Sequence, residues 1–142
     1  MTDPWHDSLH PDHDPKKEVV ILLTDMVQYS VRTSAMKPEE IRDFMIAYHL
    51  AIRDIIVVDD EDPIEIEPLA GDGALVIFDR RADEGRVEMC NRVVTAVERM
   101  ARAIDAGNLP ATRMGIYLGD IIQAQLGEKT LKFLITIELQ PA

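Results

Sequence analysis

Two aspartates lie where a buried strand is expected to end and where a tight turn is expected. Asp25 follows the apolar run 19–23, and Asp72 stands between Gly71 and Gly73. Two converging carboxylates repel each other unless a proton or a cation lies between them. Mg²⁺ takes oxygen ligands and keeps positions for water and phosphate. The pair therefore predicts a divalent-metal site; the alternative is that Asp25 caps a helix and Asp72 only occupies a turn.

The residues after Asp25 add phosphate-binding chemistry to this prediction. Residues 26–30 are expected to pass from the strand into a helix, whose first N–H groups have no partner within the helix and can bind phosphate. Gly71 and Gly73 would let the hairpin backbone approach a ligand closely. Two metal ions at such a site would suit in-line displacement of pyrophosphate by a ribose hydroxyl.

Apolar patterning predicts the elements that position these residues. Strands are expected over residues 19–23, 64–69, 74–78, 112–118, 121–124 and 130–139. The second and third form a hairpin with Asp72 at its tip, and Gly119-Asp120 is expected to join the fourth and fifth. The first strand is apolar throughout, which predicts burial on both of its faces.

Two amphipathic helices are predicted between the strands. The first begins at Pro38, with acidic residues in its first turn, and the second covers residues 83–106. The inward residues of the first helix are expected to be Ile41, Phe44, Met45, Tyr48, Ile52, Ile55 and Ile56. Those of the second are expected to be Val87, Cys90, Val94, Val97, Ala101 and Ile104.

The element order is β-α-β-β-α-β with an added β-hairpin. This order predicts an α+β, ferredoxin-like fold, in which helices cover one face of an antiparallel sheet. In that topology the end of the first strand adjoins the tip of the following hairpin, so Asp25 should lie close to Asp72. The other sheet face should be open, and an open apolar face predicts a homodimer or a heterodimer.

Composition limits the classes of protein to consider. The chain has 142 residues, from which we expect a flexible tail over 1–17 and a single domain over 18–142. The net charge of −11 argues against nucleic acid as a partner. No apolar run is long enough to insert into a membrane and no secretory signal is evident, so a cytoplasmic location is expected. The single cysteine, Cys90, is expected in the core.

Four segments, in order along the chain, carry a family resemblance. They are Leu23-Thr24-Asp25-Met26-Val27-Gln28-Tyr29-Ser30, Gly71-Asp72-Gly73-Ala74-Leu75-Val76-Ile77-Phe78, Arg113-Met114-Gly115-Ile116-Tyr117-Leu118-Gly119-Asp120 and Gly127-Glu128-Lys129. Their order and spacing resemble the motifs of the class III adenylate/guanylate cyclase catalytic domains, over residues 18–133.

The resemblance implies a nucleotidyl cyclase-like domain. Members convert ATP or GTP to the 3′,5′-cyclic nucleotide and pyrophosphate, with two Mg²⁺ or Mn²⁺ ions, at sites shared between two subunits. The implied metal ligands are Asp25, Asp72 and the carbonyl of Met26. The implied phosphate-binding residues are Val27, Gln28, Tyr29, Ser30 and Gly71.

The sequence departs from the family pattern at several positions. Gln28 replaces a usual glycine, and Pro68 and Leu134 stand where the family reads the base. The segment after residue 133 diverges or is truncated: the family's asparagine is absent from it, and the position of the transition-state arginine would fall beyond Ala142. We therefore expect little cyclase activity from this chain alone, since a transition-state cation contributes several powers of ten in rate.

Two other interpretations stay open. The chain could be a non-catalytic cyclase-homology module for dimerisation or for binding nucleotide and metal. It could also be another nucleotidyl-transfer enzyme with the same core, such as a relative of diguanylate cyclases. The absence of a Gly-Gly-Asp/Glu-Glu-Phe hairpin argues against this last interpretation.

Overall fold

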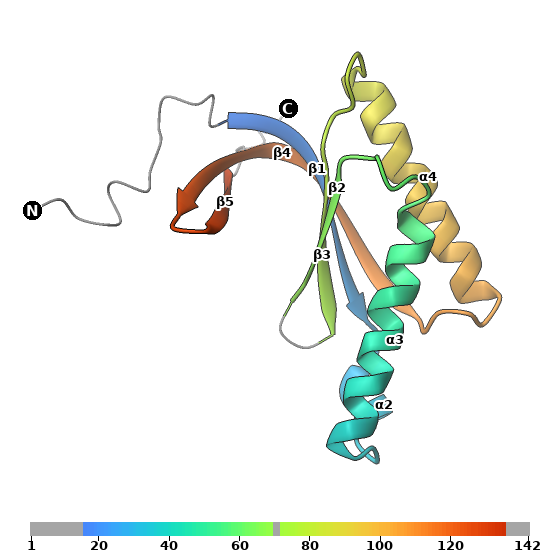
Figure 1. Ribbon diagram of the computed structural model, residues 1–142. Helices are drawn as coiled ribbons and strands as arrows, with labels where there is room; N and C mark the ends of the chain where they lie inside the picture. The colour runs from blue at the N-terminus through green and yellow to red at the C-terminus, as the bar shows by residue number, and fades with distance from the viewer. Residues whose placement is uncertain (1–15, 70–71, 136–142) are drawn as a thin grey trace, which may run out of the picture. The chain divides into compact units, whose positions relative to one another are not determined.

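The computed structural model describes residues 16–69 and 72–135, which form helices and strands in an α+β arrangement (Figure 1). The strands are β1 (Lys16–Met26), β2 (Ile64–Pro68), β3 (Gly73–Phe78), β4 (Thr112–Leu126) and β5 (Lys129–Ile135). The helices are α2 (Tyr29–Thr33), α3 (Pro38–Ile56) and α4 (Arg86–Asp105). None of these helices is both long enough and apolar enough to cross a membrane.

The strands are hydrogen-bonded in the order β2-β3-β1-β4-β5. The first four follow the ferredoxin-like arrangement, and β5 pairs antiparallel with β4, which confirms the predicted fold class. The described residues group into two compact units, one of residues 20–117 and one of residues 16–19 with 118–135. β1 begins at Lys16, whereas the sequence predicted a tail as far as residue 17.

The pairing of β1 with β3 sets which side chains point toward the helices. Leu22 lies opposite Val76, and both belong to the buried cluster that includes residues of α3 and α4. Because side chains alternate along a strand, Leu23 and Asp25 point to the other face. In Figure 1 α3 and α4 lie on the same side of β1 and β3. The helices therefore cover one face, and Asp25 lies on the opposite one.

The other sheet face is less open than the sequence predicted. Ile21 and its partner Ile77 are only 4 % and 3 % exposed, although both point away from the helices. Exposed apolar side chains occur further along β4 instead, where Ile116 and Tyr117 are 48 % and 53 % exposed. Any apolar contact with a second chain should therefore involve β4 more than the middle of β1.

The two long helices confirm one predicted face and correct the other. α3 begins at Pro38, and its residues Tyr48, Ile52 and Ile56 are buried as predicted. The prediction for α4 was wrong for Val87 and Val94, which are 71 % and 48 % exposed, and for Ala101, which is also exposed. Cys90, Val97 and Ile104 do pack partly against the core. The fully buried residues of α4 are Met89, Val93, Ala96 and Met100.

The turn predicted at Gly119-Asp120 does not form. β4 runs through both residues, and the chain turns at Gly127, which has a φ of 60°. Asp120 pairs with Ile135 of β5, and its carboxylate lies 3.5 Å from the Lys16 Nζ. The predicted strand 130–139 is β5, of which residues 136–139 lie outside the described part of the chain.

Candidate metal centre

Asp25 and Asp72 are brought together by the pairing of two strands. Asp25 is the second-last residue of β1 and lies opposite Gly73, the first residue of β3. Asp72 directly precedes Gly73. The Leu69 N–H donates to the Gly73 carbonyl at 2.9 Å, which closes the tip of the β2–β3 hairpin. The hairpin tip therefore sets Asp72 beside Asp25, the arrangement that the sequence predicted.

Gly73 allows the two strands to approach at this point. A Cβ placed on Gly73 would lie 2.9 Å from the Thr24 carbonyl oxygen, which is closer than real Cβ contacts allow. We expected this glycine to make room for a ligand, but its neighbour is the β1 backbone. The missing side chain thus positions the two carboxylates, because any larger residue would push β3 away from β1.

The two carboxyl groups interact strongly with each other. Partial burial, a hydrogen bond shared with Asp25 and repulsion from the Asp25 charge all raise the pKa of Asp72. The backbone N–H of Asp72 and the nearby Arg113 guanidinium lower the pKa, but not enough to cancel this rise. Burial is the largest of the causes that raise this pKa and repulsion from Asp25 adds to it, so a cation between the two carboxylates would favour the ionised form of Asp72.

Arg113 offsets part of the negative charge of the two carboxylates. Its Nη2 lies 2.9 Å from the Asp25 Oδ2, and the side chains of Arg113 and Asp25 are 70 % and 48 % exposed. The strand position of Arg113 explains the contact. The adjacent Thr112 hydroxyl is 2.6 Å from the Tyr48 hydroxyl of α3, so Thr112 faces the helices and Arg113 faces Asp25.

The electrostatic influence of the two aspartates extends to Tyr48. Burial raises the pKa of Tyr48, and the charges of Asp72 and Asp25 raise it further, whereas the hydrogen bond with Thr112 lowers it. Tyr48 therefore stays protonated at neutral pH and can donate to Thr112. This bond ties the start of β4 to α3 and so fixes the register in which Arg113 reaches Asp25.

A cavity of about 570 Å³ opens at these groups. Asp25, Asp72 and Arg113 contribute its charged lining, and Leu69, Gly115 and Tyr117 are among the other lining residues. The size is in the range of small-molecule sites. A Cβ on Gly115 would lie 3.3 Å from the Tyr117 ring, so this glycine leaves room for the ring at this point.

The donor set suits Mg²⁺ or Mn²⁺ better than a transition-metal cage. Within residues 16–69 and 72–135 no group of three or more His, Cys, Asp or Glu side chains converges on one point. Mg²⁺ is commonly held by one or two carboxylates, with water and substrate phosphates completing its shell. Two carboxylates at an open cavity fit that pattern. A bound cation would also favour the ionised form of Asp72 and so lower its raised pKa.

The predicted phosphate-binding segment lies beside this cavity without lining it. The Val27 N–H donates to the Ala111 carbonyl at 2.9 Å, so this amide is already engaged. Gln28 adopts a left-handed conformation, with φ 58° and ψ 38°, and Ser30 is exposed. Tyr29 packs partly against the core. Gly71 lies outside the described residues.

The side chain of Met26 is buried among the core residues that contact the helices. The prediction for Met26 concerned its carbonyl oxygen, and it stays a prediction. The residue that sequence reasoning missed is Arg113. An arginine at the start of an otherwise apolar strand was a usable signal, because a charged side chain there must point to a carboxylate, a ligand or solvent.

The sequence matches no protein-family model and no curated protein. Solved structures, however, share its fold. The guanylyl cyclase Cya2 matches with a TM-score of 0.58 and 19 % identity, over 85 % of this chain and 64 % of that chain. The chain has the fold of the class III nucleotidyl cyclase domains.

Two further structures with this cyclase fold illustrate its range. The dimeric guanylyl cyclase domain of the RhoGC fusion protein from the fungus Blastocladiella emersonii matches with a TM-score of 0.63 and 15 % identity, over 85 % of this chain and 68 % of that one. A class III adenylyl cyclase-like ATP-binding protein from Pseudomonas aeruginosa matches with a TM-score of 0.53 and 18 % identity, over 95 % of this chain and 33 % of that one. This chain thus spans less than two thirds of Cya2, the first of these structures.

Proposed function

We propose that this chain is a nucleotidyl cyclase-like domain that binds a nucleoside triphosphate together with Mg²⁺ or Mn²⁺. The observation that carries the proposal is the convergence of Asp25, Asp72 and Arg113 on one cavity. Carboxylates hold the metal ions, and a guanidinium beside them contacts phosphate oxygens, because its planar N–H groups match that geometry. The fold, shared with guanylyl cyclases and an ATP-binding relative, supports the same ligand class.

Each residue has a distinct part in this proposal. Asp25 and Asp72 would hold the metal ions, with the Met26 carbonyl as a further oxygen ligand. Bound metal would neutralise a leaving pyrophosphate and favour loss of the proton from a ribose hydroxyl. Arg113 would release Asp25 when metal binds and contact the triphosphate from the β4 side. Residues 27–30 would contact phosphate next to Asp25 in this proposal, with the backbone amides of Gln28, Tyr29 and Ser30 as the candidate donors.

The proposal extends from binding to cyclisation of the bound nucleotide, and a non-catalytic binding module is the alternative. Pro68 and Leu134, which stand at the family's base-reading positions, offer neither a side-chain donor nor a charge. The proposal therefore includes weak discrimination between ATP and GTP. It also includes a second chain, since the exposed Ile116 and Tyr117 adjoin the site on β4 and a partner there could complete it.

The test measures binding and turnover separately. Wild-type protein is titrated with Mn²⁺ and a non-hydrolysable ATP or GTP analogue, and cyclic product is assayed with Mg²⁺ or Mn²⁺ and the natural nucleotides. Asp25→Asn and Asp72→Asn should each abolish metal-dependent nucleotide binding. Asp54→Asn is the matched control, because Asp54 is an exposed aspartate on α3 that does not line this cavity.

The outcomes separate the two functions. Binding with product that both aspartate variants lose supports an active cyclase. Binding without product, again lost in both variants, supports the non-catalytic module. The proposal is wrong if the wild type binds neither nucleotide in the presence of metal, or if both variants bind as well as Asp54→Asn.

A further inference from the structure

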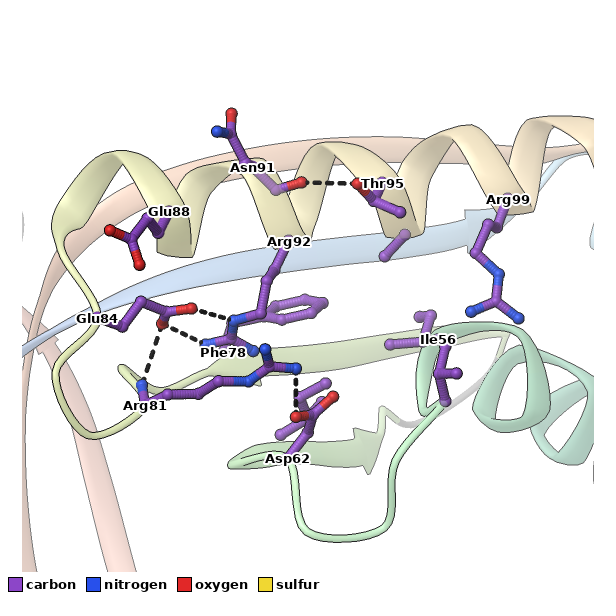
Figure 2. A pocket seen from close by; sticks show the side chains of 13 residues that line it. Ile56, Asp62, Phe78, Arg81, Glu84, Glu88, Asn91, Arg92, Thr95 and Arg99 are labelled. Atoms are coloured by element: carbon purple, nitrogen blue, oxygen red, sulfur yellow. Dashed lines mark hydrogen bonds and ion pairs between the residues drawn. The ribbon is translucent and has the colours of Figure 1, made fainter.

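A second cavity, of about 400 Å³, lies within residues 20–117 and shares no lining residue with the first. Figure 2 shows it between α4, the end of α3 and the strands β2 and β3. Apolar side chains form part of its lining, including Ile56, Ile64 and Phe78. Polar and charged residues from α4 and from the two nearby loops form the rest. The cavity thus combines an apolar wall with concentrated charge.

Arginines of α4 reach this cavity because of their spacing. Arg92 and Arg99 are seven residues apart, which is close to two helical turns, so both project from the same side of the helix. Figure 2 shows Arg92 directed toward the β3–α4 loop and Arg99 directed toward Ile56 of α3. Thr95 and Ala96 lie between them and also line the cavity. The helix thus presents two guanidinium groups with a small, partly polar surface between them.

Arg92 is held by several hydrogen bonds, but one of its guanidinium nitrogens has no acceptor in the part of the chain that the structure describes. Its Nε and Nη2 donate to the two Glu84 carboxylate oxygens at 2.7 and 2.8 Å, and Nη2 also donates to the Asp79 carbonyl. Its Nη1 is shielded from solvent and has no hydrogen-bond acceptor among the described residues. An unpaired N–H on a buried charged group is unfavourable, so an acceptor is expected there. The Arg92 side chain as a whole is 13 % exposed, so an acceptor in the cavity would reach Nη1 only if this side chain shifted.

The remaining charges leave Arg99 as a cation that faces the cavity. Arg81 forms an ion pair with Asp62, and Arg92 forms one with Glu84, so these four charges balance. No ion pair or hydrogen bond of the Arg99 side chain is found within the described part of the chain. The last acidic lining residue, Glu88, lies eleven positions before Arg99 along α4, a separation of about 16 Å. The Arg99 end of the cavity is therefore its positive end.

We propose that this cavity binds a small molecule with one oxyanion group on an apolar body. The oxyanion, a phosphate or a carboxylate, contacts Arg99 at the positive end of the cavity. The apolar body packs on Ile56, Ile64 and Phe78. Guanidinium groups match both kinds of oxyanion, and the mixed lining is typical of small-molecule sites. Nothing in the proposed cyclase function requires this second ligand.

Phenyl phosphate and phenylacetate are suitable probes, since each joins an oxyanion to an apolar ring. Either is titrated into the full chain while the Nε–Hε signals of Arg92 and Arg99 are followed by NMR. Inorganic phosphate measures the binding of the oxyanion group alone, and benzyl alcohol measures that of the apolar ring alone. Saturable shifts of both arginine signals with one aromatic probe, and weaker binding of both fragments, are expected. The probe that binds more tightly identifies the head group.

Variants tie the binding to this cavity. Arg99→Gln should weaken the better probe at least tenfold, which is about 1.4 kcal/mol. Arg102→Gln is the matched control, because it removes the same charge from the next turn of α4 outside the cavity. Arg92→Lys keeps the charge but removes the forked N–H groups, and it should also weaken binding. Asp72→Asn should leave probe binding unchanged even if it abolishes nucleotide binding, which separates this site from the metal centre.

The inference is overturned by either of two results. One is the absence of saturable shifts in the Arg92 and Arg99 signals with both aromatic probes up to roughly 10 mM, the upper limit of useful affinity for so small a ligand. The other is saturable binding that Arg99→Gln and Arg102→Gln weaken equally, which would reflect net charge alone. If Arg92→Lys does not fold, the Arg99→Gln comparison still decides.

Discussion

Replacing Arg113 with glutamine is expected to change metal affinity and nucleotide affinity in opposite directions. In the apo protein the Arg113 guanidinium lies 2.9 Å from Asp25 and neutralises a carboxylate that the metal would use. Removing the charge therefore removes a competitor for the incoming cation. The same change removes a phosphate contact once the nucleotide binds. A purely structural role of Arg113 predicts neither effect.

The magnitudes follow from charge and exposure. Unit charges about 4 Å apart in water interact by about 1 kcal/mol, and a divalent ion would be repelled up to twice as strongly, so Mn²⁺ should bind roughly 5- to 30-fold more tightly to Arg113→Gln. Loss of a hydrogen bond to a charged phosphate should weaken nucleotide binding by about 1.5–3 kcal/mol, or roughly 10- to 150-fold. The ion pair is largely exposed, so the variant should lose only about 0.2–1 kcal/mol of stability.

Isothermal titration calorimetry measures both affinities, first for Mn²⁺ alone and then for a non-hydrolysable nucleotide with Mn²⁺ at saturation. Arg102→Gln again serves as the control, because it changes the net charge equally while lining neither cavity. Thermal unfolding should shift by less than about 4 °C. The reasoning is refuted if Arg113→Gln lowers Mn²⁺ affinity, or if its nucleotide affinity equals that of Arg102→Gln.

Three further substitutions probe the strained and charged positions. Asp72→Asn should stabilise the metal-free protein at pH 7, because the folded state raises the pKa of this carboxyl above 3.8 and so makes its ionisation unfavourable. Urea unfolding should show that this gain in stability vanishes below pH 3.8, where the carboxyl is protonated in both states. Mn²⁺ should stabilise only the wild type. Glu84→Gln should lose about 3–5 kcal/mol at pH 7, since it leaves Arg92 buried without its partner. Because Arg92 lowers the pKa of Glu84, that loss should be full above pH 4.5 and shrink as the pH falls through the lowered value, which urea unfolding at several pH values would show. Gln28→Gly should stabilise by about 0.5–1 kcal/mol in a thermal unfolding assay, because relief of the left-handed strain exceeds the added flexibility of the unfolded chain; a loss of stability would contradict the assigned backbone conformation.

Local pattern was sufficient to predict the part of the fold that holds the aspartates. The apolar runs on both sides of Asp72 and the glycines around it indicated a hairpin, and the structure has β2 and β3 joined at that point. The order of strands and helices then placed the end of β1 next to the hairpin tip. The left-handed conformation of Gln28 was not predicted, although a glycine at this position would adopt it without strain.

Where the prediction failed, tertiary packing decided between two equally good local patterns. α4 carries one apolar stripe that includes Val87 and Val94 and a neighbouring stripe that includes Met89 and Val93. Helical periodicity fits both, and only the position of the sheet selects the second. Gly119-Asp120 is likewise a good turn sequence, but continued pairing with β5 keeps it in a strand.

The contact between Arg113 and Asp25 joins residues 88 positions apart and depends on how β1 and β4 are aligned. No local pattern encodes that alignment, although a one-residue slip would point Arg113 into the helices. The hydrogen bond between Thr112 and Tyr48 makes such a slip unfavourable, because it would leave a buried hydroxyl without a partner. A residue of the helical layer thus determines the charge of a site on the opposite face of the sheet.

The charges at the metal centre also bear on the order in which its ligands can bind. Two carboxylates and one guanidinium leave a net negative charge at the cavity, and repulsion from Asp25 is one of the causes that raise the pKa of Asp72. A triphosphate that entered alone would add several more negative charges, and Arg113, the cation among the described lining residues, is already engaged by Asp25. Divalent cations held by the two carboxylates would reverse this balance, because they would free Arg113 for a phosphate and offset the charge of the nucleotide. On these grounds metal and nucleotide should bind as one cooperative unit, and Asp25 and Asp72 would act by making the nucleotide's affinity depend on the metal.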